Sequence, residues 1–303
     1  MALTIGTEVA AALDAGRPVV ALESTLLAHG LPSGRNLALA HRLTAAVRAE
    51  GAVPATIAVL DGTPTIGLSP AQLDRVCAEG EALTKLTARD LGPAIAGGRS
   101  GATTVAATSV LAHRAGIGVF ATGGLGGVHL PAPGDPTTWD VSADLGVLAT
   151  TPVLVVCSGV KSVLDVAATL EVLEARSVPV LGYRTDDFPA FYLRSSGHPV
   201  PWRVDDPGVV AATVRAHREH STSGVVLANP VAPEHEMDRA LHDRLLAEGL
   251  DRVRESGTRG GGVTPVLLAH FHAASGGASV ATNEALVLAN ATLAAQVAAA
   301  LAA

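Results

Sequence analysis

The α/β character of this chain is clearest in residues 101–165, GATTVAATSVLAHRAGIGVFATGGLGGVHLPAPGDPTTWDVSADLGVLATTPVLVVCSGVKSVLD. Two apolar runs within it, residues 117–120 and 153–156, have the length of buried strands. Glycine-rich turns follow both runs, and these turns carry a histidine, aspartates and a lysine. In a parallel sheet, small molecules bind at the carboxyl ends of the strands. We therefore expect the functional site in this stretch.

The chain has 21 basic residues, of which only two, Lys85 and Lys161, are lysines. A composition rich in Ala, Gly, Arg and Val indicates a coding bias that replaces dispensable lysines by arginine. Arginine carries the same charge, but only a lysine amine can form an imine. Lys161 follows a predicted strand and the turn Cys157-Ser158-Gly159, and we expect it to open a helix and to be buried. The alternative is that both lysines are ordinary surface residues.

Length and composition favour one large α/β domain over residues 1–303. Hydrophobic residues make up 48% of the chain but aromatic residues only 3%, so small aliphatic side chains must build the core. Charged residues make up 16%, and such a low share predicts that some surface is buried between subunits. We therefore expect a homo-oligomer.

The net charge of −7, without a basic run, argues against a nucleic acid polymer as partner. Cys77 and Cys157 have neither metal-site spacing nor a secreted context, which favours reduced thiols. The N-terminus has no basic start before an apolar core, and no apolar segment reaches about 18 residues without polar breaks. We expect a cytoplasmic protein with no membrane partner.

Glu23 ends the predicted strand PVVALE and precedes a loop that contains His29 and Asn36. A carboxylate at a strand end is a candidate acid/base group, and the alternative is a solvated glutamate. His29 and Asn36 either orient a ligand or close a turn. Further along, Asn283 and Asn290 are seven residues apart and so share one face of a long apolar helix, as core amides or as site residues.

Residues 97–104, GGRSGATT, follow Lys85, Arg89 and Asp90 and resemble a phosphate cradle, in which glycines, hydroxyls and a helix N-terminus receive the phosphate. The stretch lacks the Gly-Lys-Ser/Thr end of the Walker pattern. The glycines at 124, 126 and 127 lack the G-x-G-x-x-G spacing, so a nicotinamide cofactor is not indicated.

Asp140 and Asp144 are four residues apart, on one face of a helix or within reach of one point from a loop. One aspartate with waters and phosphate oxygens is a common site for Mg²⁺ or Mn²⁺, and the alternative is no metal.

Helices are predicted over residues 7–15, 36–50, 70–80 with Ser69 as N-cap, and 239–255. Asp61-Gly62 predicts a tight hairpin, and strands alternate with helices elsewhere, as in a parallel sheet. The loop over residues 185–207 is rich in aromatic residues and predicts a lid or a subunit contact.

Taken together, the chain resembles the pseudouridine-5′-phosphate glycosidase family, which includes indigoidine synthase A-like proteins. The motifs follow in uninterrupted order from about Val19 to the C-terminus: ALESTLLAHGLP, GAVPATIAVLDG, KLTARDL, GATTVAAT, FATGGLGGVH, WDVSADL, CSGVKSVLD, RTDDFPAFY, ANP and SVATN. The resemblance implies a three-layer α/β/α fold with a largely parallel central sheet, a homotrimer and a Mn²⁺ ion. The chain departs from many relatives at Gly260, Gly261 and Gly262 and at His270 and His272.

The implied reaction is the reversible cleavage of the C–C glycosidic bond of pseudouridine 5′-phosphate to uracil and ribose 5-phosphate. By motif, Glu23 matches the proton donor, Lys161 the nucleophile and Asp140 the metal ligand. The implied substrate-binding residues are Lys85, Thr104, Val105, Thr122, His129, Ser142, Ala143, Asp144 and Asn283. A C–C bond has no leaving oxygen to protonate, so a carboxylate pair would not suffice, whereas a lysine imine at C1′ withdraws electrons from the bond.

Two alternatives remain. The chain could be a related enzyme of secondary, pigment-forming metabolism that acts on another phosphorylated C-nucleoside. It could also be a catalytically silent protein that binds sugar phosphates.

Overall fold

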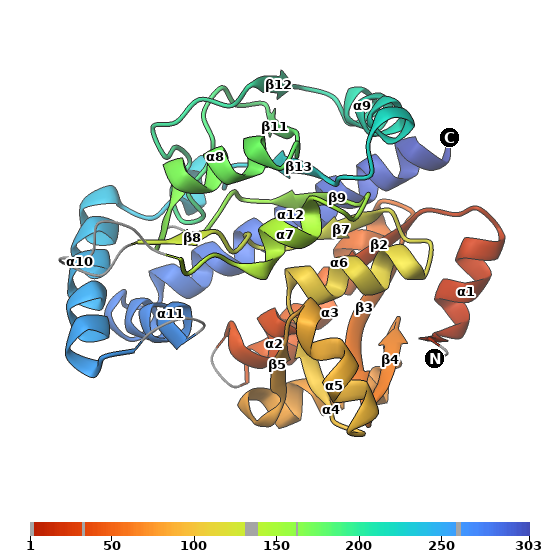
Figure 1. The fold of residues 1–303 in the computed structure, drawn as a ribbon, viewed down its shortest axis with the longest axis horizontal. Helices are drawn as coiled ribbons and strands as arrows, with labels where there is room; N and C mark the ends of the chain where they lie inside the picture. Colours follow the sequence, from red (N-terminus) through yellow and green to blue (C-terminus); the bar gives the residue numbers. More distant parts are fainter. Residues whose placement is uncertain (1–2, 32–33, 131–138, 162, 259–261) are drawn as a thin grey trace.

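The computed structural model describes residues 3–31, 34–130, 139–161, 163–258 and 262–303. Within them, eleven strands form one sheet, and β8 pairs with β10 in a separate antiparallel ribbon. The sheet is parallel through the order β3-β2-β7-β9-β13-β11-β12 and gains antiparallel pairs only where β3 meets β4 and β6 (Figure 1). The strands are β1 Thr4–Ile5, β2 Val19–Leu22, β3 Val53–Leu60, β4 Thr63–Ile66, β5 Thr84–Leu86, β6 Gly101–Thr103, β7 Val119–Ala121, β8 Val128–His129, β9 Leu154–Cys157, β10 Leu164–Asp165, β11 Val180–Tyr183, β12 Trp202–Val204 and β13 Val225–Ala228.

Helices cover both faces of this sheet, as predicted. Helix α12 crosses one face with α3 and α9 against it, while α6 and α7 lie on the other face (Figure 1). Strands β2, β9, β11 and β13 are buried at every residue, which explains their continuous apolar runs. The helices are α1 Thr7–Asp14, α2 Thr25–His29, α3 Asn36–Ala49, α4 Pro70–Glu79, α5 Leu91–Ala96, α6 Val105–Arg114, α7 Ala143–Leu148, α8 Val166–Ala175, α9 Pro207–His220, α10 Arg239–Ser256, α11 Val263–Ala274 and α12 Ala278–Ala302.

The local signals in the first third of the chain are confirmed. Asp61 and Gly62 both have positive φ, 48° and 75°, and join β3 to β4 in a two-residue hairpin. Ser69 accepts a hydrogen bond from the Gln72 amide, and the Gln72 side chain accepts one from the Ser69 amide. This capping box, with Pro70 at the first helical position, starts α4 where predicted.

Helix α12 is the most apolar long helix among the described residues, with a mean hydropathy of 1.8, and it meets the length and composition of a membrane span. It packs on the sheet instead, because its contacts include β2, β7 and β9 as well as α3 and α9. Its polar residues Asn283, Glu284 and Asn290 are all buried and bonded within the protein. The asparagines lie on one face, as predicted, and that face is turned to the strand ends.

One prediction about the site region is wrong: Lys161 does not open a helix. Gly159 has a φ of 74°, which turns the chain out of β9, and Val160 then bridges to Leu125. The next helix, α8, begins only at Val166, after β10 has paired with β8. Lys161 therefore lies in a loop between two strand contacts, where its carbonyl accepts a hydrogen bond from the Leu164 amide at 3.0 Å, and it is half-buried rather than buried.

The aromatic loop before β12 is anchored to the core. Phe188, Phe191 and Tyr192 are all buried, and the Tyr192 ring stacks on Phe271 of α11 with 5.4 Å between ring centroids. Trp202, in contrast, is 66% exposed. Most of the aromatic surface of this loop therefore closes the interior of the subunit. The predicted departures at Gly260 and Gly261 lie outside the described residues, and His270 and His272 lie on α11.

Candidate active site

The register between two neighbouring strands determines where the first site residues lie. Leu22 of β2 pairs with Ala121 of β7, so the next residues, Glu23 and Thr122, emerge side by side at the carboxyl edge of the sheet. The Thr122 hydroxyl donates a short hydrogen bond to the Glu23 carboxylate. Burial raises the pKa of Glu23, although the charge of Lys161 and the Thr122 hydroxyl oppose that shift. Glu23 is thus held at a strand end as a carboxyl group that gives up its proton reluctantly.

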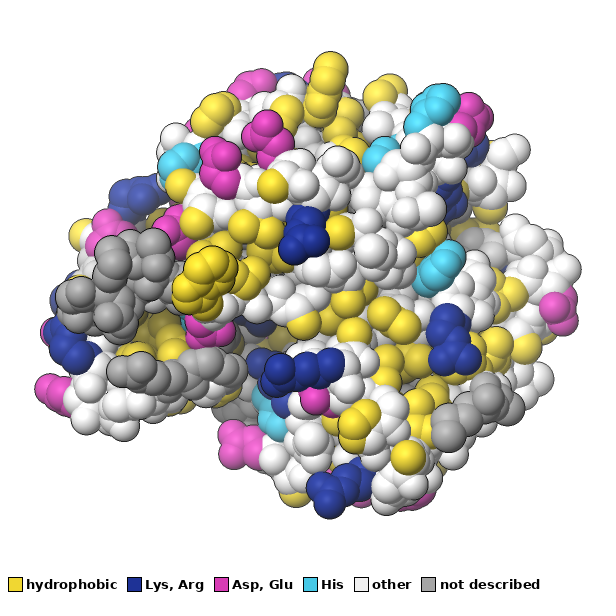
Figure 2. Space-filling model, in the orientation of Figure 1, with side chains coloured by type: hydrophobic (Ala, Val, Ile, Leu, Met, Phe, Trp, Pro, Cys, Tyr) yellow, Lys and Arg dark blue, Asp and Glu magenta, His cyan; other side chains and the backbone are white. Residues whose placement is uncertain are grey.

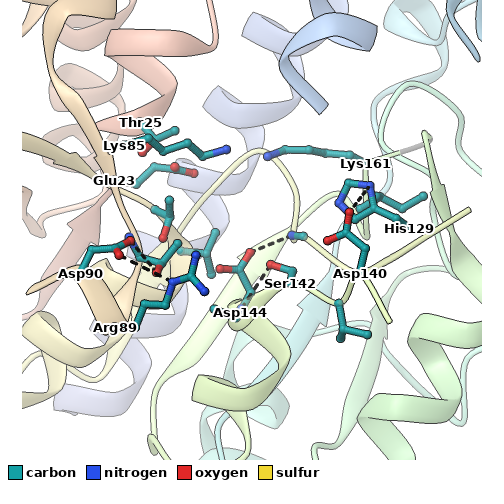
Figure 3. A pocket seen from close by; sticks show the side chains of 17 residues that line it. Glu23, Thr25, Lys85, Arg89, Asp90, His129, Asp140, Ser142, Asp144 and Lys161 are labelled. Atoms are coloured by element: carbon teal, nitrogen blue, oxygen red, sulfur yellow. Dashed lines mark hydrogen bonds and ion pairs between the residues drawn. The ribbon is translucent and has the colours of Figure 1, made fainter. Parts of the chain in front are cut away.

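Lys161 reaches the same edge from β9, two strands away from β2. Leu125 is bonded to this turn at two points: its amide donates to the Gly159 carbonyl at 2.9 Å, and its carbonyl accepts from the Lys161 amide at 3.2 Å. The side chain leaves this turn toward Glu23, as Figure 3 shows. Two glycine turns that follow adjacent strands therefore fix the position of the amine.

Gly159→Ala tests how tightly this turn is built. A Cβ at residue 159 would lie 1.9 Å from the Pro189 carbonyl oxygen, and the φ of 74° disfavours any L side chain. We expect a loss of about 2–5 kcal/mol in the free energy of unfolding, measured by urea denaturation. Gly116→Ala is the control, because Gly116 has a φ of 83° but no atom within 4 Å of the added Cβ. Equal losses in the two variants would contradict the close packing at Gly159.

Lys85 comes from a different part of the sheet and meets Lys161 at the site. It lies on the short strand β5, which pairs with β6 and is thereby placed beside β3. In Figure 3 the amine ends of Lys85 and Lys161 point toward each other, with the Glu23 carboxylate beside them. Lys85 is exposed to the open cavity, yet desolvation by the cavity walls and the charge of Lys161 lower its pKa. Both lysines of the chain thus occupy one site.

The larger of two adjoining chambers has a volume of about 540 Å³ and is polar. Two helices begin at its wall: α6, whose N-cap Thr104 accepts a hydrogen bond from the Ala107 amide, and α7, whose N-cap Ser142 accepts one from the Asp144 amide. Helix N-termini carry a partial positive charge and unpaired amides, which suit an anion. With Lys85 in the same wall, this chamber is fitted to a phosphorylated ligand.

The smaller chamber, of about 50 Å³, lies on the other side of the same catalytic candidates. It shares Glu23, Lys85 and Lys161 with the large chamber and adds apolar walls from Phe191 and Leu268. Its polar groups are the His29 ring and the Asn283 amide, and the buried His29 Nε2 and Asn283 Oδ1 have no hydrogen-bond partner among the described residues. Burial and the Lys85 charge lower the pKa of His29, so its ring is neutral at pH 7. A flat polar ring would satisfy both atoms.

Asp140 lines the large chamber, and its Oδ2 lies 3.8 Å from Nδ1 of His129. Burial lowers the pKa of the His129 imidazole, against the opposing charge of Asp140. Among the described residues, no three His, Cys, Asp or Glu side chains converge as a metal cage would require. A hard ion that keeps most of its waters needs only one or two carboxylates. The donor set therefore fits Mn²⁺ or Mg²⁺ held by Asp140 together with solvent or ligand oxygens.

Asp144 has a mainly structural setting in the ligand-free site. Its two carboxylate oxygens accept hydrogen bonds from the amides of Ala106 and Gly126, at 2.9 and 2.8 Å. It thereby joins the start of α6 to the glycine turn after β7. These two hydrogen bonds hold the phosphate-fitted wall together, and each oxygen of the carboxylate that faces the chamber has a partner.

Comparison with known proteins identifies the fold and its relatives. The family model described as indigoidine synthase A like protein matches residues 8–300. The chain belongs to the indigoidine synthase A-like family. This confirms the predicted resemblance to that family.

Indigoidine synthase A-like relatives of this chain include proteins named pseudouridine-5′-phosphate glycosidase. Those of Streptomyces griseus and Salinispora tropica are each 54% identical to it, over 97% and 98% of the chain and 90% and 91% of the relatives. Among solved structures, the prealnumycin C-glycosynthase AlnA in complex with ribulose 5-phosphate has a TM-score of 0.90 at 40% identity, covering 99% of this chain and 97% of AlnA. An indigoidine synthase A-like protein from Thermotoga maritima has a TM-score of 0.88 at 34% identity, covering 99% of this chain and 97% of that one. The prediction that the chain is an enzyme is confirmed.

The structure brings together the side chains that the sequence singled out. The large chamber is lined by Glu23, Lys85, Thr104, Val105, His129, Asp140, Ser142, Ala143, Asp144 and Lys161, the small one adds Asn283, and Thr122 contacts Glu23 from behind. Asn36 closes a turn instead, because its amide donates to the carbonyls of Leu27 and Cys77.

Sequence reasoning missed several residues of the site. Thr25 and Thr87 line the large chamber, and Phe191, Pro265 and Leu268 close the small one. A hydroxyl two residues after Glu23 and another two residues after Lys85 were the available signals for the threonines. The apolar residues come from the aromatic loop and from α11, and no pattern in the sequence connects these segments with the strand ends.

Proposed function

We propose that this enzyme cleaves the C–C glycosidic bond of pseudouridine 5′-phosphate reversibly, to uracil and ribose 5-phosphate. The observation that carries the proposal is the meeting of both lysines with Glu23 at the junction of a phosphate-fitted chamber and a small, partly apolar one. The names of the relatives at 54% identity support the same reaction.

The ligand fits the two chambers in one orientation. The 5′-phosphate belongs in the large chamber beside Lys85, where the N-cap residues Thr104 and Ser142 of α6 and α7 line the wall. The uracil ring belongs in the small chamber, where its amide groups can pair with Asn283 and His29 and its face can lie against Phe191. The C1′–C5 bond then crosses the junction beside Lys161 and Glu23.

Lys161 acts as the nucleophile in this proposal. Its amine attacks C1′, the C1′–O4′ bond breaks, and the proton that the attacking nitrogen loses passes to O4′ as the ribose opens. Uracil C5 then takes a proton from Glu23, and the nitrogen lone pair forms a C1′=N iminium as the C1′–C5 bond breaks and its electrons return to the uracil ring. Water adds to the iminium and releases ribose 5-phosphate and the free amine, so one water is consumed per turnover.

Glu23 is suited to the proton transfers because of its position as well as its surroundings. Its raised pKa keeps the carboxyl protonated to higher pH than an exposed glutamate, which favours donation to carbon. The Thr122 hydroxyl fixes one oxygen and leaves the other facing the junction. After C5 has been protonated, the carboxylate formed is stabilised by the nearby Lys161 charge.

A divalent metal, proposed as Mn²⁺, would be held by Asp140 and would supply positive charge to ligand oxygens in the large chamber. Asp140→Ala should raise the Mn²⁺ concentration needed for half-maximal activity by about 10–100-fold. Binding of Mn²⁺ followed by electron paramagnetic resonance gives a readout that is independent of turnover. Unchanged Mn²⁺ affinity in Asp140→Ala would remove Asp140 from this role.

The direct test is incubation of the enzyme with pseudouridine 5′-phosphate and Mn²⁺, with uracil measured by chromatography. Release of uracil and ribose 5-phosphate in equal amounts is expected, and the reverse incubation should regenerate the nucleotide. Dephosphorylated pseudouridine is the control, because the phosphate-fitted wall should make it a poor substrate. Uracil release from neither compound would overturn the proposal.

The likeness to AlnA favours one second candidate, namely formation or cleavage of a C-glycoside whose aglycone is not a nucleobase. This corresponds to the alternative of an enzyme in secondary metabolism. A panel of phosphorylated C-glycosides decides between the two. Turnover of a larger aromatic C-glycoside without turnover of pseudouridine 5′-phosphate would select the second candidate, although the small chamber of about 50 Å³ favours a single-ring base.

For assembly we propose a homotrimer in the cytoplasm. The surface supports self-association, because charged side chains are scattered on the face in Figure 2 and apolar ones are broadly distributed between them. Trp139 is 95% exposed and Val141 beside it is 42% exposed, which is unusual for aromatic and branched side chains facing water. Sedimentation velocity should give three copies per particle, and a monomer at micromolar concentration would contradict the assembly.

A further inference from the structure

Asn290 lies outside both chambers, yet it is bonded to the segments that carry the reacting groups. It is fully buried on α12, two helical turns beyond Asn283. Its Nδ2 group donates to the Thr122 carbonyl at 2.8 Å and to the Ser158 hydroxyl at 3.1 Å. Its Oδ1 atom accepts from Nδ2 of Asn229 at 3.0 Å. Each polar atom of this amide is therefore used.

These partners stand at the carboxyl ends of three neighbouring parallel strands. Thr122 follows β7, Ser158 follows β9, and Asn229 follows β13. A parallel sheet leaves the peptides at its strand ends without ladder partners, and a buried carbonyl without a hydrogen bond destabilises the fold. The Asn290 amide of α12 supplies hydrogen-bond partners to this edge of the sheet, where the chain leaves the strands and enters the site.

We propose that Asn290 is a positioning residue for the reaction: it fixes the Thr122 peptide so that the Thr122 hydroxyl meets Glu23, and it fixes Ser158, from which the chain turns to Lys161. The role in turnover rests on the proposed function, whereas the effect on Glu23 does not. Asn290 touches no ligand in this proposal, since it lines neither chamber.

The link from Asn290 to Glu23 passes through a single residue. The Thr122 amide donates to Val156 and its carbonyl accepts from Asn290, so the peptide is held on both sides, and only then does the hydroxyl donate to Glu23. The link to Lys161 passes through Ser158, whose amide donates to Gly123 and whose carbonyl accepts from Phe191. Loss of the Asn290 amide therefore removes one hydrogen bond from each of the two turns.

Asn290→Ser is the test variant. We expect kcat for uracil release to fall by about 10–100-fold with little change in KM, because a small displacement of reacting groups affects the transition state more than binding. Titration of the Glu23 carboxyl, followed by ¹³C NMR and assigned with Glu23→Gln, should shift to higher pH, because the Thr122 hydroxyl no longer favours the carboxylate. The titration needs no substrate, so it stands even if the proposed reaction is wrong.

A double-mutant cycle separates positioning from simple destabilisation. Thr122→Val alone should shift the Glu23 titration upward, and adding Asn290→Ser should then shift it by less than Asn290→Ser does alone, because both changes remove the Thr122 hydrogen bond. Additive shifts would overturn the proposed route through Thr122. The control is Asn36→Ser, which removes another buried, fully bonded amide and should lower stability without moving the titration.

A second variant covers the case in which Asn290→Ser does not fold. Asn229→Ser removes one donor to Asn290 and leaves the bonds to Thr122 and Ser158 in place. It should shift the Glu23 titration in the same direction by a smaller amount. An unmoved titration in this variant would show that the amide only stabilises the fold, and that result would overturn the proposal.

Discussion

Lys161→Ala should lower the rate of uracil release from pseudouridine 5′-phosphate by about 10⁴-fold or more, because the remaining amine in the cavity, that of Lys85, belongs with the phosphate in this proposal. Lys161→Arg keeps the positive charge and a similar length but cannot form an imine, so it should be nearly as inactive. A rate within about 10-fold of the wild type in Lys161→Arg would mean that charge, not nucleophilicity, is what the site requires.

Borohydride trapping makes the same prediction in covalent form. With ribose 5-phosphate and borohydride, the peptide that contains Lys161 should gain the mass of one reduced sugar phosphate. Lys85 is the internal control, since its amine faces the same cavity but belongs with the phosphate. A labelled Lys85 beside an unlabelled Lys161 would reverse the roles of the two lysines.

Glu23→Gln should lower kcat by about 10²–10⁴-fold, which is the usual contribution of a positioned general acid. In the wild type, the rate should fall as pH rises through the raised pKa of Glu23, because the protonated carboxyl is the form that donates to carbon. That limb of the pH–rate profile should be absent in Glu23→Gln. If the limb persisted unchanged, another group would be the donor.

The same pKa also predicts a change in stability. The unfolded chain ionises Glu23 near 4.5 and the folded protein only at higher pH, so the wild type loses stability as pH rises from that value through the folded pKa. Glu23→Gln removes this loss and should be the more stable protein at pH 7, measured by urea denaturation. Equal stability of the two proteins at pH 7 would mean that the folded protein does not disfavour ionisation of Glu23.

Much of the site was predictable because the end of a strand can be recognised from a few neighbouring residues. Glu23 and Thr122 each follow an apolar run by one residue, and the parallel register then makes them neighbours. The rarity of lysine pointed to Lys161 and Lys85 before any geometry was known. The hairpin at Asp61-Gly62 and the capping box at Ser69 rest on contacts within four residues, which is why their boundaries were predicted closely.

What failed or was missed depends on distant segments. The helix predicted at Lys161 is replaced by a loop because Val160 bridges to Leu125 and β10 pairs with β8, and neither partner is visible in the local pattern. The apolar wall of the small chamber comes from Phe191 and Leu268, which reach the strand ends only through the tertiary packing of the aromatic loop and α11. Short sequence patterns do not predict such contacts between segments that are far apart in the chain.

The confinement of both lysines to one cavity also makes the protein unusual as a target for acylating reagents. Apart from the α-amino group, an activated ester finds no ε-amine elsewhere in the 303 residues, because the other 19 basic side chains are arginines. Any such label beyond the N-terminus therefore reports on the cavity, and occupancy by a ligand can be followed directly as protection from acylation.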